Sequence, residues 1–248
     1  MDSFIYSLLN NYSLITNIIF GNDKCIVCNK FCFYSICESC KSNITANYIF
    51  YFKVDQTNFY HFDKLYFNDV YSVSNYSNLL PLIREYKFNN KIYLSLFLSS
   101  LVRNLVNKYS LEFDLIVNVP NHDFFQYTFY LSLNLSRIYK KPLFNIISIS
   151  DNYQKQHFIE NKTERIRNVK NKYKIKNLNK ANKILNKLCL KLNKDKLNIL
   201  LIDDIIKTGA TVNEISKLIK NNFKLINNII VVSLAKAWIK LMNIYLHN

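Results

Sequence analysis

Glycine and proline are scarce in this sequence, with 2 and 3 residues among 248. Acidic residues are also few, since 17 Asp and Glu stand against 33 Lys and Arg and leave a formal charge of +16. Asn, Lys, Ile, Tyr and Phe dominate instead, a bias typical of a strongly AT-rich genome. The charge therefore has two interpretations: binding to a polyanion such as nucleic acid, or compositional drift.

Long apolar runs are missing as well. No uninterrupted stretch approaches the roughly 20 apolar residues of a membrane-spanning helix, so we expect no membrane span. The first ten residues lack a basic segment, and polar residues interrupt their apolar positions, which argues against a signal peptide. Half of all residues are nevertheless apolar, too many for a disordered chain. We expect a cytoplasmic protein with one α/β domain and a small accessory module.

Six cysteines are present, and in a reducing compartment they are better suited to metal binding than to disulfides. Four of them form two pairs, Cys25 with Cys28 and Cys37 with Cys40. Each pair can bring two thiolates to one ion, and two pairs complete a tetrahedral structural Zn²⁺ site. Cys32 lies between the pairs and is an alternative ligand.

Hydrophobic spacing predicts strands that alternate with helices, the pattern of a parallel sheet covered on both faces. Strands are expected over residues 69–73, 113–120, 143–149, 198–203 and 228–234. Helices are expected over residues 1–20, through the leucines between 79 and 105, around 129–138 and over 211–221. We divide the chain into a helical segment (1–20), a zinc-knuckle module (21–60) and a main domain (61–238).

Residues 177–197 have the composition of a basic, low-complexity insertion in the main domain. Ile184, Leu188 and Leu192 are spaced to form a narrow apolar stripe if the segment is helical. Cys189 is the one cysteine of this segment, and we expect it to be a bystander rather than a nucleophile.

The segment 198–211 carries the most specific pattern in the chain. An apolar strand is followed at its carboxyl end, where open α/β sheets bind ligands, by Asp203 and Asp204. A turn through Thr208 and Gly209 then leads into a helix, whose first backbone N–H groups and positive end favour a phosphate. Gly209 is one of only two glycines, and such a turn needs a residue that tolerates positive φ. The structural alternative is an acidic strand end followed by a capped helix.

This pattern resembles the signature of type I phosphoribosyltransferases, which bind phosphoribosyl pyrophosphate. The resemblance implies a type I phosphoribosyltransferase-like parallel sheet flanked by helices. It also implies that Asp203 and Asp204 bind the ribose hydroxyls and that Mg²⁺ accompanies the pyrophosphate. The residues implied around the 5′-phosphate are Lys207, Thr208, Gly209, Ala210 and Thr211.

The four-cysteine knuckle together with this signature resembles the ComF family, proteins associated with natural competence and the handling of incoming DNA in bacteria. The resemblance covers residues 25–237. Its further marks are the segments 62–65, 87–88, 119–120 with His122, 164–169 and 231–237.

The chain departs from the family pattern at three places, one of which is the insertion 177–197. Tyr127, Thr128, Phe129 and Tyr130 stand where relatives carry Arg-Gly-Phe-Asn, and His157 stands where relatives usually have glutamine. The lost Arg and Asn would lie near the ligand, so the departure weighs against turnover more than against the fold. A histidine without a visible partner is usually structural, and we assign no catalytic residue.

We therefore expect a phosphoribosyltransferase-fold protein that binds a phosphoribosyl ligand and acts in DNA uptake, without a need for turnover. Its expected partners are phosphoribosyl pyrophosphate or a related phosphosugar, single-stranded DNA, and DNA-uptake or recombination proteins. The first alternative is an active phosphoribosyltransferase that transfers ribose 5-phosphate to a nitrogen nucleophile. The second is a basic zinc-knuckle protein that binds nucleic acid.

Overall fold

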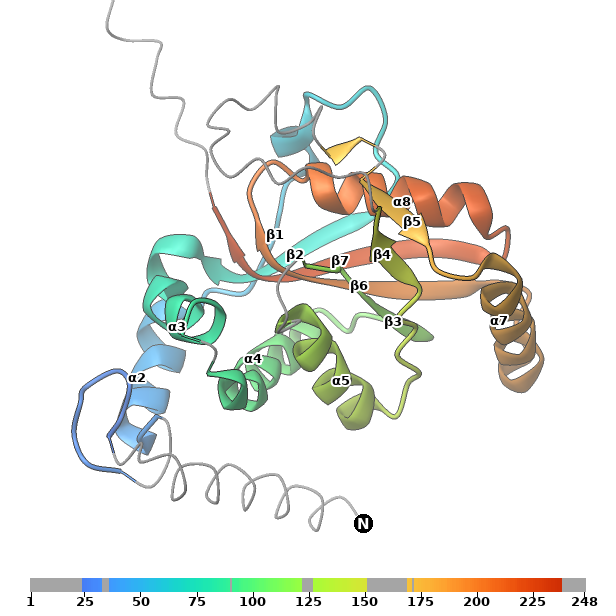
Figure 1. Ribbon diagram of the computed structural model, residues 1–248. Coiled ribbons are helices and arrows are strands. Elements are labelled where there is room, and N and C mark those ends of the chain that lie inside the picture. The colour runs from blue at the N-terminus through green and yellow to red at the C-terminus, as the bar shows by residue number, and fades with distance from the viewer. Residues whose placement is uncertain are drawn as a thin grey trace, which may run out of the picture.

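A five-stranded sheet in the order β1-β2-β7-β6-β3 forms the centre of the computed structural model (Figure 1). The strands β2, β7, β6 and β3 are parallel, and β1 pairs with β2 in antiparallel orientation. The strand bounds are β1 Phe52–Lys53, β2 Asp69–Asn75, β3 Leu115–Asn118, β6 Leu197–Ile206 and β7 Ile226–Lys236. The expected α/β class with a mostly parallel sheet is thus confirmed.

The structure describes residues 24–32, 36–89, 91–121, 127–150, 169–170 and 172–237. The helix expected over residues 1–20 lies outside these ranges. None of the helices within them is long and apolar enough to cross a membrane.

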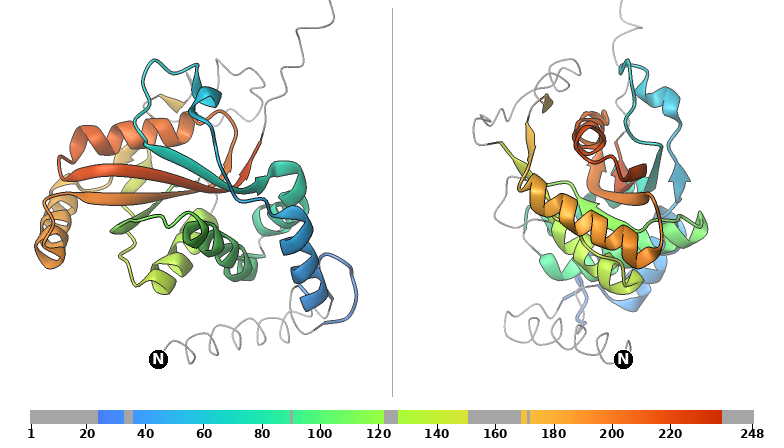
Figure 2. Two further views of the ribbon diagram at one scale, coloured as in Figure 1. Left: turned by 180° about the vertical axis from the view of Figure 1, so that it is seen from behind. Right: turned by 90° about the vertical axis from the view of Figure 1, so that its right-hand side faces the viewer.

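Helices cover both faces of the sheet, as two further views show (Figure 2). On one face lie α3 (Tyr76–Lys87), α4 (Ser95–Lys108) and α5 (Tyr127–Tyr139), with the short helix η2 (Ile92–Leu94) between the first two. On the other face lies α8 (Ala210–Asn222). Strands buried from both sides explain the nearly continuous apolar runs in the sequence.

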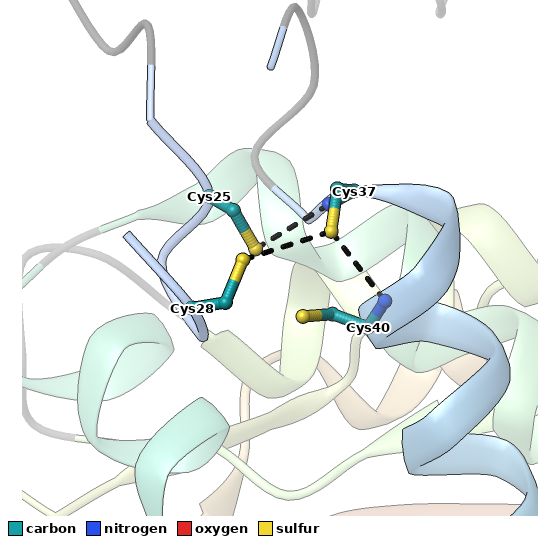
Figure 3. A group of neighbouring side chains, drawn as sticks. All are labelled: Cys25, Cys28, Cys37 and Cys40. Atoms are coloured by element: carbon teal, nitrogen blue, oxygen red, sulfur yellow. Dashed lines mark hydrogen bonds between the residues drawn. The ribbon is translucent and has the colours of Figure 1, made fainter. Parts of the chain in front are cut away.

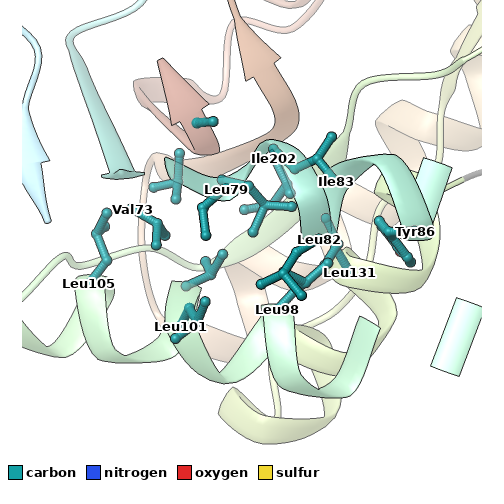
Figure 4. Close-up of a cluster of buried hydrophobic side chains, with 14 of the residues drawn as sticks. Val73, Leu79, Leu82, Ile83, Tyr86, Leu98, Leu101, Leu105, Leu131 and Ile202 are labelled. Carbon is teal, nitrogen blue, oxygen red and sulfur yellow. The ribbon is translucent and has the colours of Figure 1, made fainter. Parts of the chain in front are cut away.

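The face under α3, α4 and α5 holds a continuous cluster of buried side chains (Figure 4). Members of the cluster from the three helices and the sheet include Leu79, Leu82, Ile83, Leu98, Leu101, Leu105, Leu131, Val73 and Ile202. The same cluster includes Cys25, Ile36, Cys40 and Ile44 from the cysteine-rich segment. That segment therefore shares a core with the main sheet, while the boundary placed at residue 60 stays a prediction.

Residues 42–68, which show no hydrophobic period, contain the end of α2 (Glu38–Tyr48), the strand β1 and the short helix η1 (Gln56–Phe59). The predicted strand 143–149 is wrong in extent and position. Only Ile147–Ile149 (β4) is a strand, and it pairs with Tyr173–Ile175 (β5) in a separate antiparallel sheet. The start of the segment contacts the main sheet through the bridge between Leu143 and Ile116. Phe144, Ile146 and Ile147 pack into a second core cluster on the α8 side.

The basic segment 177–197 is largely helical, since α7 spans Leu178–Leu192. The predicted stripe is partly wrong: Ile184 is 40% exposed, and the buried row is Ala181, Leu185 and Cys189. Ala and Cys are small, so the sequence pattern gave them little weight. Figures 1 and 2 place α7 at the end of the sheet opposite α3.

The packing of α7 can be tested with a pair of leucines on this helix. Leu185 is fully buried, whereas Leu190 is 83% exposed. Leu185→Ala should lower the free energy of unfolding by about 2–5 kcal/mol, because it removes core contacts and leaves a cavity. Leu190→Ala should change it by less than about 0.5 kcal/mol. Equal effects of the two variants in urea unfolding would contradict this packing.

Candidate functional site

The first cysteine pair lies on a tight turn. The N–H of Cys25 donates to the carbonyl of Lys30 at 2.8 Å, and the N–H of Asn29 donates to the carbonyl of Cys25 at 2.8 Å. Asn29 has φ +59°, a left-handed conformation that asparagine tolerates better than most residues. This turn brings Cys28 back beside Cys25 (Figure 3).

The second pair lies at the start of α2. Cys37 is the N-cap residue, and its Sγ accepts the N–H of Cys40 at 3.4 Å. The N–H groups of Val27 and Cys37 both donate to Sγ of Cys25, also at 3.4 Å. Backbone N–H groups directed at sulfur stabilise the thiolate form that a metal requires.

The four sulfur atoms form one compact group. Sγ of Cys25, Cys28, Cys37 and Cys40 all lie within 4.8 Å of one another, and those of Cys28 and Cys37 are 3.8 Å apart. Tetrahedral Zn²⁺ with Zn–S distances of about 2.3 Å requires sulfur–sulfur distances of about 3.8 Å. The predicted ligands are therefore brought together in a geometry compatible with zinc, and the alternative ligand Cys32 is not part of the group.

The thiols differ in acidity. Burial raises the pKa of Cys25, but the backbone N–H donors of Cys28, Cys37 and Val27 outweigh it and lower the pKa from 9.0 to about 6. Burial and the neighbouring thiols raise the pKa of Cys40. A metal would therefore find one ligand already ionised near neutral pH and would have to displace a proton from another.

The second candidate site lies at the carboxyl end of β6. This strand continues to Ile206, so Asp203 and Asp204 are inside it rather than after it. The helix α8 begins at Ala210, one residue earlier than predicted, with Gly209 as its N-cap residue at φ +82°. The positive φ expected of this glycine is confirmed.

Gly209 is also required by a close contact. A Cβ atom at this position would lie 2.6 Å from Cε1 and 2.8 Å from Cδ1 of Phe59. Phe59 cannot easily retreat, because it is 1% exposed and packs edge-on against Phe67 at 5.3 Å between ring centroids. Both conformation and space therefore exclude any side chain at residue 209.

Hydrogen bonds fasten the segment after Phe59 to the same turn. Nε2 of His61 donates to the carbonyl of Thr208 at 3.0 Å. Nδ2 of Asn213 donates to the carbonyl of Lys64 at 3.1 Å, and Oδ1 of Asn213 accepts the N–H of Tyr66 at 2.9 Å. The sequence analysis did not identify His61 and Asn213 as part of the site. Its one available signal was Asn213, an asparagine on the buried face of a helix.

The two aspartates have different surroundings. Successive residues of a strand point to opposite faces, so Asp203 shares the face of Leu201 and Asp204 that of Ile202. Asp203 is 6% exposed, and its Oδ1 accepts the N–H of Asp204 at 2.9 Å. Burial first, and the charge of Asp204 second, raise the pKa of Asp203 well above its usual value. The Asp204 side chain instead forms an ion pair with Lys87 of α3.

Other polar groups gather at this edge of the sheet. Asn118 is the last residue of β3 and pairs in register with Ile202, and its amide has no hydrogen-bond partner among the described residues. Lys236, at the end of β7, is 4% exposed and donates to the carbonyl of Lys207 at 2.7 Å. A buried amide with unused hydrogen-bonding capacity suits a site that binds a polar group.

Comparison of the chain with models of protein families and with curated proteins gives no match.

Of the residues predicted around a phosphate, Thr208 and Ala210 are buried, and the Thr208 hydroxyl accepts the N–H of Ala210 at 3.2 Å. Lys207 is exposed, and Thr211 lies in the first turn of α8. His122, His157 and residues 164–168 lie outside the described residues.

The metal assignment predicts different outcomes for two buried cysteines. Cys25→Ser should lose stoichiometric zinc and lower the free energy of unfolding by roughly 3 kcal/mol or more, because the ligand set shares the main core. Cys189→Ser lies in α7, away from the ligand set, and should keep the metal. Elemental analysis and urea unfolding measure both effects, and stoichiometric zinc in Cys25→Ser would refute the ligand set.

The raised pKa of Asp203 predicts how stability depends on pH. The folded protein holds this proton where the unfolded chain releases it, so stability falls as pH rises from about 4 through the folded pKa. Asp203→Asn removes this loss and should raise the thermal midpoint at neutral pH. The matched change at an exposed position, Asp195→Asn, should not. Equal midpoints of wild type and Asp203→Asn from pH 5 to 8 would contradict the prediction.

Proposed function

We propose that the chain has a type I phosphoribosyltransferase-like fold and binds a phosphorylated ribose at the carboxyl end of β6. One observation carries the proposal: Gly209, held at φ +82° against Phe59, joins an acidic strand end directly to the first turn of a helix. The parallel sheet places this junction at the edge where α/β proteins bind ligands.

The start of α8 has the properties of a phosphate site. Gly209 cannot cap the helix with a side chain, so the N–H groups at Thr211 and Val212 are not capped from that position. The positive end of the helix adds attraction for an anion. In the proposed complex the phosphate lies at this turn, and Asp203 and Asp204 accept hydrogen bonds from the ribose hydroxyls.

The four-cysteine group is proposed to hold one Zn²⁺ ion. Its ligands would be Cys25, Cys28, Cys37 and Cys40, which leave no open coordination position. The ion would contribute stability to the first turn of α2 and to the core that it shares with α3 and α4. We assign it no chemistry.

The residues that replace the family's Arg-Gly-Phe-Asn favour binding without turnover. Tyr127 and Thr128 are buried in α5. The Tyr127 ring packs against Tyr86 at 5.4 Å between centroids, and the Thr128 hydroxyl donates to the carbonyl of Val119. These contacts use Tyr127 and Thr128 as support for the core, and neither residue supplies the guanidinium of the family's arginine. Release of pyrophosphate from phosphoribosyl pyrophosphate would instead show that the protein is an active transferase.

A role in DNA uptake, as a ComF family member, is proposed on the resemblance of the sequence. A basic surface on α7 favours single-stranded DNA as one partner. The exposed lysines of α7 and the residues after it are Lys180, Lys183, Lys187, Lys191, Lys194 and Lys196, of which Lys194 forms an ion pair with Asp114. Because α7 lies at the opposite end of the sheet from α3, DNA bound there would leave the proposed phosphate site open.

Two variants distinguish recognition of the phosphate from recognition of the ribose. Gly209→Val should abolish binding of both inorganic phosphate and ribose 5-phosphate, because its side chain strains the turn and meets Phe59. Asp203→Asn with Asp204→Asn should leave phosphate binding intact and weaken ribose 5-phosphate about tenfold to a hundredfold. Calorimetry measures the affinity of wild type and of each variant for both ligands, with Asp195→Asn as the control variant. Equal affinity of wild type and Gly209→Val for ribose 5-phosphate would refute the site.

The basic surface predicts salt-dependent DNA binding without sequence preference. The logarithm of the affinity should fall linearly with the logarithm of the salt concentration, with a slope that reports roughly three to six neutralised phosphates. Replacing Lys180, Lys183 and Lys187 by Gln should reduce that slope by about 2. The same charge change at the exposed Lys24, Lys30 and Lys64, outside the segment 177–197, should have less effect. No binding at low salt would identify the charge as compositional drift.

A further inference from the structure

The acidic end of β6 already carries a cation that the chain itself supplies. Lys87, the last residue of α3, places Nζ 2.5 Å from Oδ2 of Asp204. The two side chains are 27% and 15% exposed, so water screens the pair only partly. The other carboxylate oxygen, Oδ1, accepts the N–H of Ile205 at 2.7 Å. Asp204 is therefore held at both oxygens.

A divalent cation would have to share this position. Mg²⁺ binds carboxylate oxygens at about 2.0–2.1 Å in near-octahedral geometry, and Oδ2 of Asp204 already has an ammonium group beside it. Charges of the same sign repel strongly where water is scarce. Asp203 adds little negative charge that could attract Mg²⁺, because burial and the Asp204 charge favour its neutral form. The strand end is thus close to charge balance without a metal.

Further lysines supply positive charge to the same edge. Lys236 is nearly buried and contacts the carbonyl of Lys207, immediately before the proposed phosphate turn. Lys172 precedes β5 and interacts electrostatically with Asp203, although burial lowers the pKa of its amine. Together with Lys87, these residues come from three separate segments of the chain. Positive charge that would otherwise come from a metal is therefore built into the fold.

We propose that Lys87 takes the place of a divalent cation, so that the protein binds its phosphorylated ribose ligand without Mg²⁺. This inference rests on the proposed function. An ammonium group has three N–H donors, so it can bind Asp204 and a ligand oxygen at the same time. It also holds Asp204 in the orientation in which its carboxylate accepts a ribose hydroxyl.

Calorimetry with phosphoribosyl pyrophosphate tests the proposal. The magnesium-free buffer is prepared with a chelating resin and contains no soluble chelator, so that the cysteine site keeps any zinc. Wild-type affinity should differ by less than about threefold between this buffer and one with Mg²⁺. Lys87→Met should bind at least about tenfold more weakly without Mg²⁺, the loss expected for one charge-assisted hydrogen bond. Mg²⁺ should restore part of the affinity, because Oδ2 of Asp204 becomes accessible.

A neighbouring ion pair provides a matched control. Lys91 lies 2.6 Å from Glu85, and these side chains are 25% and 24% exposed, similar to Lys87 and Asp204. Lys91→Met should therefore leave the affinity for phosphoribosyl pyrophosphate unchanged both with and without Mg²⁺. Lys87→Arg, which keeps the charge, should retain binding without Mg²⁺ and covers the case in which Lys87→Met does not fold.

The outcomes separate this inference from the proposed function. Wild-type protein that binds with Mg²⁺ but at least about tenfold more weakly without it would overturn the role of Lys87 and leave the ligand site standing. Unchanged affinity of Lys87→Met in the magnesium-free buffer would also overturn the role of Lys87 and leave the ligand site standing. Absence of binding by wild type in both buffers would overturn the site itself, and with it the inference.

Discussion

The close approach of Phe59 to Gly209 is the contact on which the candidate ligand site depends. Any Cβ atom at residue 209 would overlap the ring, and the backbone there adopts a φ that other residues avoid. The contact lets the turn after β6 double back tightly into α8. His61 and Asn213 then fix the turn and the helix to the segment that carries Phe59. In a chain with two glycines, one is therefore placed where no other residue fits.

Charge is distributed unevenly over the molecule, and the distribution matters more than the net value. At the carboxyl edge of the sheet, Lys87 and Lys236 are partly or fully buried and contact specific groups, Asp204 and the carbonyl of Lys207, although Lys207 itself is exposed. On α7, at the other end of the sheet, the lysines are exposed. Buried cations discriminate between ligands by geometry, whereas exposed ones attract polyanions in a salt-dependent way. The two sets therefore suit different partners.

The cysteine group and the sheet share one hydrophobic core. Cys25 and Cys40 are buried in the cluster that also contains Leu79 and Leu98. The helix α3, whose last residue is Lys87, packs on the same cluster. This connection joins the two candidate sites through one hydrophobic core, although they come from segments far apart in the sequence.

The sequence by itself determined the elements whose signals are local. Apolar runs marked β3, β6 and β7, because strands buried on both faces are rich in apolar residues. A shorter strand-like run with Val70, Tyr71 and Val73 marked β2. The paired spacing of Cys25, Cys28, Cys37 and Cys40 marked one group, because a short loop confines each pair. The positive φ of Gly209 followed from the turn that must join a strand to a helix. These features depend on residues within a few positions of one another.

Only the tertiary structure decided the features that depend on distant residues. The buried row of α7 is set by the surface against which the helix packs, and small residues such as Ala181 leave little trace in a hydrophobicity pattern. Residues 143–149 were assigned to the wrong sheet because strand pairing depends on a partner, β5, more than twenty residues away. Lys87 meets Asp204 across 117 positions of sequence, and no local pattern encodes that contact. Long-range packing places these groups together, because the energy that fixes them comes from surfaces that the folded chain alone creates.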